Sequence, residues 1–145
     1  PPPGRSARWL DVGSGGGLPG VVIAALEPGV DVTCVDTVGK KAAFVQQVAG
    51  ELRLPNLHAV HTRVEAMATP PFDGITSRAF ASLADFVALT ADRLANDGVW
   101  MAMKGKLPQD EIDALPAEID VFHVEQLRVP GLDADRCLVW MRRKR

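Results

Sequence analysis

The chain has 145 residues, a length that suits one domain with its own hydrophobic core. Hydrophobic residues make up 47% of it and charged residues 23%, as in ordinary globular proteins, and a net charge of −2 excludes a strong overall preference for nucleic acid. No apolar run approaches the roughly 18 residues that a membrane span needs, and the first residues lack the apolar segment of a signal peptide, so we expect a cytoplasmic protein without a membrane partner.

Strands and helices are expected to alternate along the chain. The expected strands are residues 8–12, 31–36, 58–62, 73–77, 99–104, 120–129 and 136–142. The expected helices are residues 19–27, 39–54, 82–94 and 109–115. This alternation predicts an α/β fold, a doubly wound, mostly parallel sheet of about seven strands with helices on both faces and an antiparallel pair at the end. We expect residues 1–145 to form a single domain that is truncated at its N-terminus, since the chain lacks an initiating Met.

Two helices and two cysteines give more specific expectations. Residues 39–54 should turn one face to the core, formed by Phe44, Val45, Val48 and Leu52. Ser82 followed by Asp85 forms a capping-box pattern at the start of the helix 82–94. The residues that should face inward from this helix are Leu83, Phe86, Val87, Thr90 and Leu94. Cys34 and Cys137 fall in separate strand-like runs and should be buried free thiols.

A glycine-rich stretch, LDVGSGGGLPG at residues 10–20, follows the first strand. Its G-x-G-x-G spacing misses the dinucleotide fingerprint, and Leu18 and Pro19 stand where a Walker loop needs Lys and Ser or Thr. Parallel α/β sheets bind ligands beyond the carboxyl ends of their strands, which is where these glycines fall. Beside Asp11, a small ligand with a cationic or zwitterionic end fits better than a phosphate, and S-adenosylmethionine is one such ligand. A tight strand-to-helix turn is the alternative.

Six segments in order carry a resemblance that covers nearly the whole chain. They are DVGSGGGLPG, VDTVGKKAAFVQQV, TRVEAM, PPFDGITSRAFASL, AMKGKLPQDEI and LDADRCLVW. The first is similar to motif I of class I S-adenosylmethionine-dependent methyltransferases, and the full set resembles the RsmG (GidB) family. The resemblance implies a Rossmann-like fold and methylation of the N7 atom of a guanine in bacterial small-subunit (16S) ribosomal RNA. The resemblance also implies an additional N-terminal helical segment in family members, which we expect to be absent from this chain.

The resemblance also assigns a cofactor site at the ends of the strands. The residues that would bind S-adenosylmethionine are Asp11, Gly13, Gly15, Gly17, Leu18, Asp36, Val64, Glu65 and Arg78. Asp11 would order the loop and face the methionine amine, and Asp36 would accept hydrogen bonds from the ribose hydroxyls. Alternatives remain for both acids: Asp11 could cap loop amides, and Asp36 could cap the helix that follows it. Val64 and Glu65 would line the adenine pocket, although Glu65 fits an exposed loop equally well.

Several cations fall near the same strand ends and form a possible rim for RNA phosphates. They are Lys40, Lys41, Arg63, Lys104 and Lys106. A scattered set of solvated charges is the alternative, and the basic tail 142–145 is a second candidate for RNA contact. Phe80 could stack on the target base or pack in the core. The expected partner is ribosomal RNA or the small ribosomal subunit.

The expected chemistry is positioning rather than acid–base catalysis. Guanine N7 has a free lone pair, so no proton must leave before methyl transfer, and we assign no catalytic residue. His58, His61 and His123 lack metal-ligand spacing, so no metal is expected. Residues 70–72, Pro-Pro-Phe, precede the fourth strand instead of following it and should only tighten a loop. A class I methyltransferase for small molecules or proteins, and a binding module without activity, are the alternative functions.

Overall fold

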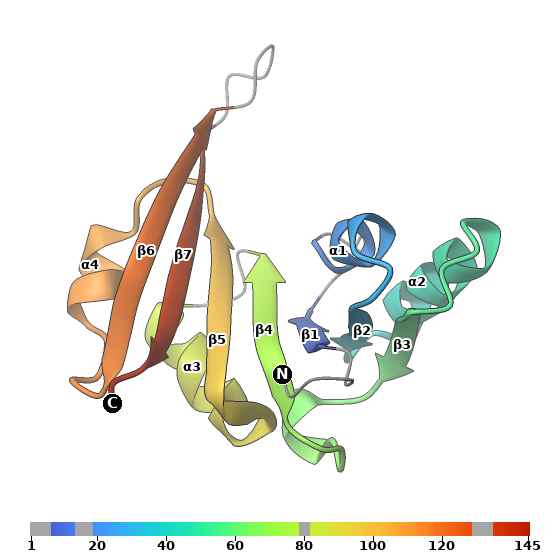
Figure 1. Ribbon diagram of the computed structural model, residues 1–145, viewed down its shortest axis with the longest axis horizontal. Helices are drawn as coiled ribbons and strands as arrows, with labels where there is room; N and C mark the ends of the chain where they lie inside the picture. Colours follow the sequence, from blue (N-terminus) through green and yellow to red (C-terminus); the bar gives the residue numbers. More distant parts are fainter. Residues whose placement is uncertain (1–6, 14–18, 79–81, 129–134) are drawn as a thin grey trace.

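The protein folds around one twisted sheet of seven strands, seen in the computed structural model, which describes residues 7–13, 19–78, 82–128 and 135–145 (Figure 1). The strands are β1 (Arg8–Val12), β2 (Asp31–Asp36), β3 (Leu57–His61), β4 (Phe72–Arg78), β5 (Leu94–Lys104), β6 (Ile119–Arg128) and β7 (Asp135–Arg143). Their order is β3-β2-β1-β4-β5-β7-β6, with the first five parallel and β7 antiparallel to both neighbours. The predicted doubly wound sheet and its antiparallel pair are therefore confirmed.

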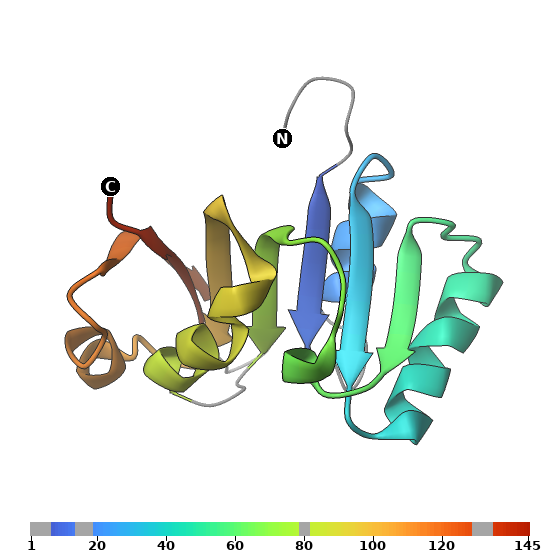
Figure 2. The ribbon, with the colours of Figure 1, turned by 90° about the horizontal axis from the view of Figure 1, so that it is seen from below.

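Helices cover the sheet from both sides (Figure 2). The α-helices are α1 (Gly20–Leu26), α2 (Gly39–Glu51), α3 (Leu83–Thr90) and α4 (Gln109–Asp113), and the 3-10 helices are η1 (Val64–Ala66) and η2 (Ala91–Arg93). Helices α1 and α2 bury Ala24, Val45 and Ala49 against β2 and β3. Helix α3 and helix η1 cover the opposite face, where the larger part of the core lies.

Two sequence predictions about helices need correction. In α2 the buried residues are Ala42, Val45 and Ala49, whereas Phe44 and Leu52 are 49% and 57% exposed. The small alanine side chains let α2 approach the sheet closely, so the larger hydrophobic residues turn outward. Leu94 is buried as predicted, but it begins β5 because α3 ends at Thr90 and η2 follows. The Ser82 cap is confirmed, since its Oγ accepts a hydrogen bond from the Asp85 amide at 3.1 Å.

Trp100 on β5 is the largest fully buried side chain of the core. Its indole Nε1 donates to Thr90 Oγ1 at 2.9 Å, and that hydroxyl donates to the Phe86 carbonyl at 2.7 Å. The indole N–H and the hydroxyl in this buried pair of hydrogen bonds both have partners, and the two bonds hold α3 against β5. Cys34 and Cys137 are both buried, and neither forms a disulfide within the described residues, as predicted.

The parallel strands end together at one edge of the sheet. Val12 pairs with Val35 on one side and with Ser77 on the other, and Arg78 pairs with Met103 on β5. The order of the strands reverses between β1 and β4, which makes the end of β1 the topological switch point of the sheet. We call this side, where the parallel strands finish, the carboxyl edge, and the other side the amino edge.

Candidate functional site

A cleft of about 180 Å³ lies at the carboxyl edge over β1, β2 and β3. It is lined by Val12, Gly13, Val35, Asp36, Thr37, Thr62, Arg63, Val64, Glu65 and Leu89. Five of the fourteen predicted site residues therefore line one cleft, namely Gly13, Asp36, Arg63, Val64 and Glu65. Gly13 follows directly on β1, and Val64 and Glu65 lie on η1, which comes soon after β3. The parallel register of the strands brings these three residues together.

Gly13 has a backbone conformation that favours glycine. Its φ is 65°, in the left-handed region, and its amide donates to the Val35 carbonyl at 2.9 Å. The hydrogen bond extends the β1–β2 ladder by one residue beyond the pairing of Val12 with Val35. This geometry accounts for one glycine of the motif, while Gly15, Gly17 and Leu18 lie outside the described residues.

Asp11 lies fully buried beneath the start of α1. Its Oδ2 accepts a hydrogen bond from the Gly20 amide at 2.8 Å, and a Cβ on Gly20 would come within 2.7 Å of that oxygen. Gly20 is therefore required for this close approach of helix and carboxyl group. Asp11 Oδ1 accepts no hydrogen bond from any residue that the structure describes. Asp11 thus caps an amide, as one sequence interpretation proposed, and its other oxygen has no partner in the described part of the chain.

Burial controls the protonation of Asp11. Loss of hydration raises the pKa of its carboxyl group to about 8, whereas the Gly20 hydrogen bond and the positive charge of Arg78 act in the opposite direction. The negative charge of Asp36 adds slightly to the increase. At neutral pH the folded protein therefore holds Asp11 mainly as the neutral acid.

This shift predicts that stability falls as pH rises. In the unfolded chain Asp11 loses its proton near pH 3.8, but in the folded chain only near pH 8. The contribution of Asp11 to the free energy of unfolding is therefore complete below pH 3.8. It is lost progressively as the pH rises to 8, by at most about 1.4 kcal/mol per pH unit. Asp11→Asn should flatten this part of the profile in urea unfolding at several pH values. Asp97→Asn, whose side chain is 91% exposed, is the control and should leave the slope unchanged; equal slopes for wild type and Asp11→Asn would contradict the prediction.

The outer wall of the cleft is held by contacts between the loops that follow β2 and β3. Asp36 is 8% exposed, and its Oδ1 accepts from the Val38 amide at 2.8 Å, which orders the loop leading into α2. His61 Nε2 lies 3.0 Å from the Thr37 carbonyl and ties β3 to the same loop. Thr37 and Thr62 line the cleft but were not predicted; their positions one residue beyond β2 and β3 are the sequence signal that could have found them.

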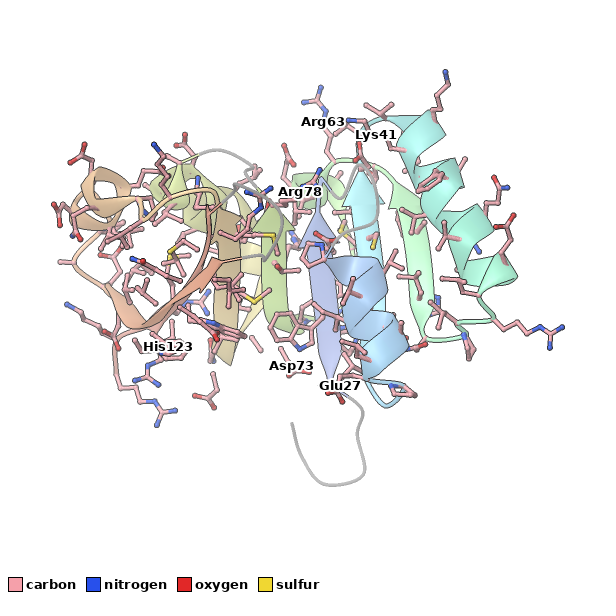
Figure 3. All side chains as sticks on the ribbon, turned by 90° about the horizontal axis from the view of Figure 1, so that it is seen from above. Glu27, Lys41, Arg63, Asp73, Arg78 and His123 are labelled. Atoms are coloured by element: carbon pink, nitrogen blue, oxygen red, sulfur yellow. The ribbon has the colours of Figure 1, made fainter. Side chains whose placement is uncertain are left out.

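Arg78 is the last residue of β4, the strand that lies between β1 and β5 in the sheet. The side chain is exposed, and its charge acts on Asp11 of the neighbouring strand. Figure 3 shows Arg78, Arg63 and Lys41 at this edge, with Glu27 and Asp73 at the opposite one. Lys40 and Lys41 are exposed in the first turn of α2, which contains no acid. Phe80 lies outside the described residues.

Lys104 is less available than the sequence suggests. Its Nζ lies 3.0 Å from Glu111 Oε1, and its side chain is only 14% exposed. The same Glu111 oxygen accepts from the Leu83 amide at 2.9 Å, so Lys104 and Glu111 join β5, α4 and the start of α3. Lys106, two residues further on, is exposed. The geometry favours Lys106 over Lys104 as a contact for an external anion.

Two features from the sequence lie at the amino edge, away from the cleft. Arg8 Nη1 donates to the carbonyls of Pro70 and Pro71 at 2.7 and 2.9 Å, so these prolines do fix a loop before β4. In the basic tail, Arg142 pairs with Asp120, and Arg143 donates to the Ala91 and Ala95 carbonyls. The tail thus runs along the edge opposite to the cleft.

Within the described ranges, no cluster of three His, Cys, Asp or Glu side chains could hold a metal ion. None of the helices in those ranges is long and apolar enough to cross a membrane.

Solved structures with the same fold include several methyltransferases. The chain is similar to TrmN from Thermus thermophilus (TM-score 0.74, 17% identity, covering 96% of this chain and 44% of that one). It is also similar to a ribosomal protein L11 methylase from Lactobacillus delbrueckii subsp. bulgaricus (TM-score 0.74, 17% identity, 99% and 73%). At such low identity these similarities show the fold alone, which is that of class I methyltransferases.

Sequence comparison is more specific. Residues 3–139 match the family model GidB, rRNA small subunit methyltransferase G. Curated proteins with the name ribosomal RNA small subunit methyltransferase G are 66% identical in Acidovorax sp. (strain JS42) and 68% identical in Leptothrix cholodnii, over 94% and 93% of this chain. The chain spans 60% and 62% of the lengths of these two relatives. The chain belongs to the rRNA small subunit methyltransferase G family.

Proposed function

We propose that the cleft over β1, β2 and β3 binds S-adenosylmethionine. The observation that carries this proposal is the meeting of Gly13, Asp36 and η1 in one cleft at the switch point of a class I methyltransferase fold. Asp36 is a buried acid at the end of β2, suited to accept hydrogen bonds from ribose hydroxyls. The residues present therefore fit this ligand in both the place and the chemistry of their donors and acceptors.

Asp11 and Arg78 would serve the amino-acid end of the ligand. An ammonium group beside Asp11 would favour the ionised carboxylate, and the Arg78 guanidinium could form two hydrogen bonds with the ligand carboxylate. Asp11 belongs to β1, the strand that leads into Gly13, and Arg78 belongs to β4, which lies across β1 from Asp36 on β2. The remaining predicted residues, Gly15, Gly17 and Leu18, would complete the site from the loop before α1.

Arg78→Leu should weaken binding of S-adenosylmethionine by about 10-fold or more, because a charge-assisted hydrogen bond contributes about 1.5–3 kcal/mol. Titration calorimetry of the chain with the cofactor measures this change directly. Arg145→Leu removes an arginine whose side chain is 85% exposed at the amino edge and should bind as wild type does. Equal affinities for the wild type and both variants would show that Arg78 does not bind the cofactor.

We further propose that the methyl acceptor is N7 of a guanine in 16S ribosomal RNA, and that the protein acts in the cytoplasm. When bound, S-adenosylmethionine supplies a methyl group on a positively charged sulfur, and guanine N7 has a lone pair that can accept it without losing a proton. The protein then needs to align the two reactants and exclude water. The family to which the chain belongs, with relatives at 66% and 68% identity, supports this acceptor.

The test is methyl transfer to ribosomal particles. Small subunits from cells that lack this activity are incubated with the chain and radiolabelled S-adenosylmethionine, and the methylated nucleosides are identified by mass spectrometry. The Leptothrix cholodnii relative runs in parallel as the full-length control. We expect 7-methylguanosine in 16S RNA. Label in protein or in a small molecule would instead support the alternative class I methyltransferase, and cofactor binding without any transfer while the control is active would support a binding module.

A further inference from the structure

A second cavity, of about 550 Å³, lies at the carboxyl edge over the other half of the sheet. It is lined by Gly105, Lys106, Leu107, Gln126, Leu127, Arg136 and Cys137, and we call it the hairpin groove. One wall is the chain between β5 and α4, and the other is the outer end of the β6–β7 hairpin. We propose that the hairpin groove binds a single-stranded segment of the RNA substrate, an inference that rests on the proposed function.

The groove exists because the hairpin is longer than β5. Lys104 is the last residue of β5 and pairs with Cys137, after which the chain turns into the loop before α4. The pairing of β6 with β7 continues beyond that point, through Leu127 with Arg136 and Arg128 with Asp135. The hairpin therefore rises past the ends of the parallel strands (Figure 1). A ligand in the groove would meet both the loop and the projecting hairpin.

The charge of the groove suits an anion. Lys106 and Arg136 are exposed, and no carboxylate is among the described residues that line the groove. The cleft over β1–β3 differs, because its described lining residues include the carboxylates of Asp36 and Glu65 as well as the cation Arg63. The described lining of the cleft thus includes two carboxylates, which suit a ligand with a positively charged sulfur, whereas the charged residues described in the hairpin groove are cations, which suit phosphates.

The apolar residues of the groove make a nucleotide a better occupant than an isolated anion. Leu107 and Leu127 line it and are 42% and 40% exposed, so a base could cover their side chains while its phosphate meets Lys106 or Arg136. Gln126 adds an amide that can both donate and accept hydrogen bonds. Apolar surface, amide and cations together are what a stretch of single-stranded RNA contacts.

The position of the groove fits methyl transfer in the neighbouring cleft. In the strand order, β4 and β5 stand between β1 and β7, so three intervals of about 4.8 Å separate the end of β1 from the hairpin. This gap of about 14 Å can be bridged by a short stretch of RNA. A nucleotide held in the groove would leave the target guanine near the end of β4, beside the cofactor cleft. The basic tail, at the amino edge, cannot place RNA there.

The test measures binding of a short, fluorescently labelled single-stranded RNA to the chain by anisotropy, between 50 and 300 mM salt. The double variant Lys106→Gln with Arg136→Gln should bind about tenfold more weakly at low salt. The slope of log affinity against log salt should fall by about 1.4, since each phosphate contact to a single strand contributes about 0.7. Leu107→Ala with Leu127→Ala should weaken binding but leave the slope unchanged.

The matched control is the double variant Arg142→Gln with Arg145→Gln. It also removes two positive charges, but at the amino edge, and should bind RNA as the wild type does. Circular dichroism verifies that each variant is folded, and Lys106→Gln alone serves if the Arg136 change unfolds the chain. Equal losses in the groove and control variants, no RNA binding by the wild type, or preference for an acidic peptide over RNA would overturn the inference. RNA binding through the groove without methyl transfer would refute the proposed function but leave the groove assigned.

Discussion

Gly13→Val should abolish binding of S-adenosylmethionine. A β-branched side chain at φ 65° is strained by about 1–3 kcal/mol, and its methyl groups would project where Gly13 lines the cleft. Relief of the strain would also break the hydrogen bond from the Gly13 amide to the Val35 carbonyl, which extends the pairing of β1 with β2. Calorimetric titration should show no heat of binding, and methylation should fall to background.

The control for this variant is Gly29→Val, since no atom lies within 4 Å of a Cβ at Gly29. It tests whether any added valine impairs the protein. Thermal unfolding of both variants separates loss of the site from loss of the fold. A folded Gly13→Val protein with wild-type affinity would show that the cofactor does not approach the backbone at this glycine.

Trp100→Ala should have the largest effect on stability, a loss of about 3–5 kcal/mol in the free energy of unfolding. Trp100 is fully buried at the centre of the core, and alanine would leave a cavity that α3 and β5 cannot both close. The truncation also leaves the Thr90 hydroxyl without its indole donor, although that hydroxyl keeps its bond to the Phe86 carbonyl. Urea unfolding at constant pH measures the loss.

Two companion variants divide this loss into its parts. Trp100→Phe keeps most of the volume and removes the N–H group, so it should be much less destabilising than Trp100→Ala. Thr90→Val leaves the indole N–H buried and unpaired, at a cost of about 1–3 kcal/mol. A loss below 1 kcal/mol for Trp100→Ala would mean that the core rearranges around this position.

The strands could be predicted well because short buried runs of β-branched residues end at clear turns. The bounds of β1 and β2 agree with the sequence prediction at both ends. Residues 95–98, which include the turn-forming Asn96 and Gly98, separate the expected helix 82–94 from the expected strand 99–104. The structure places them inside β5: Leu94 pairs with Phe72 and Val99 with Gly74, so residues 95–98 bulge from the strand. A turn signal alone does not show whether the strand resumes afterwards on the same partner.

Other features depended on contacts between distant segments and could not be predicted. The predicted face of α2 was right for Val45 but wrong for Phe44 and Leu52, because the helix buries the smaller Ala42 and Ala49 instead. The burial of Asp11 depends on Gly20 nine residues later, and the pairing of Lys104 depends on where α4 places Glu111. Charge reversal at Lys104 would set two carboxylates together, so an RNA contact is tested more cleanly at Lys106.

The strand order also has a consequence for how the chain is made. Strand β7 is the last in sequence, yet it lies between β5 and β6. As the protein emerges from the ribosome, the five parallel strands can assemble early, but β6 has no described neighbour other than β7 and must wait for residues 135–143. Until then β5 presents an unpaired edge of the kind that invites aggregation. A nascent chain stalled before these nine residues would lack the attachment of two strands rather than one.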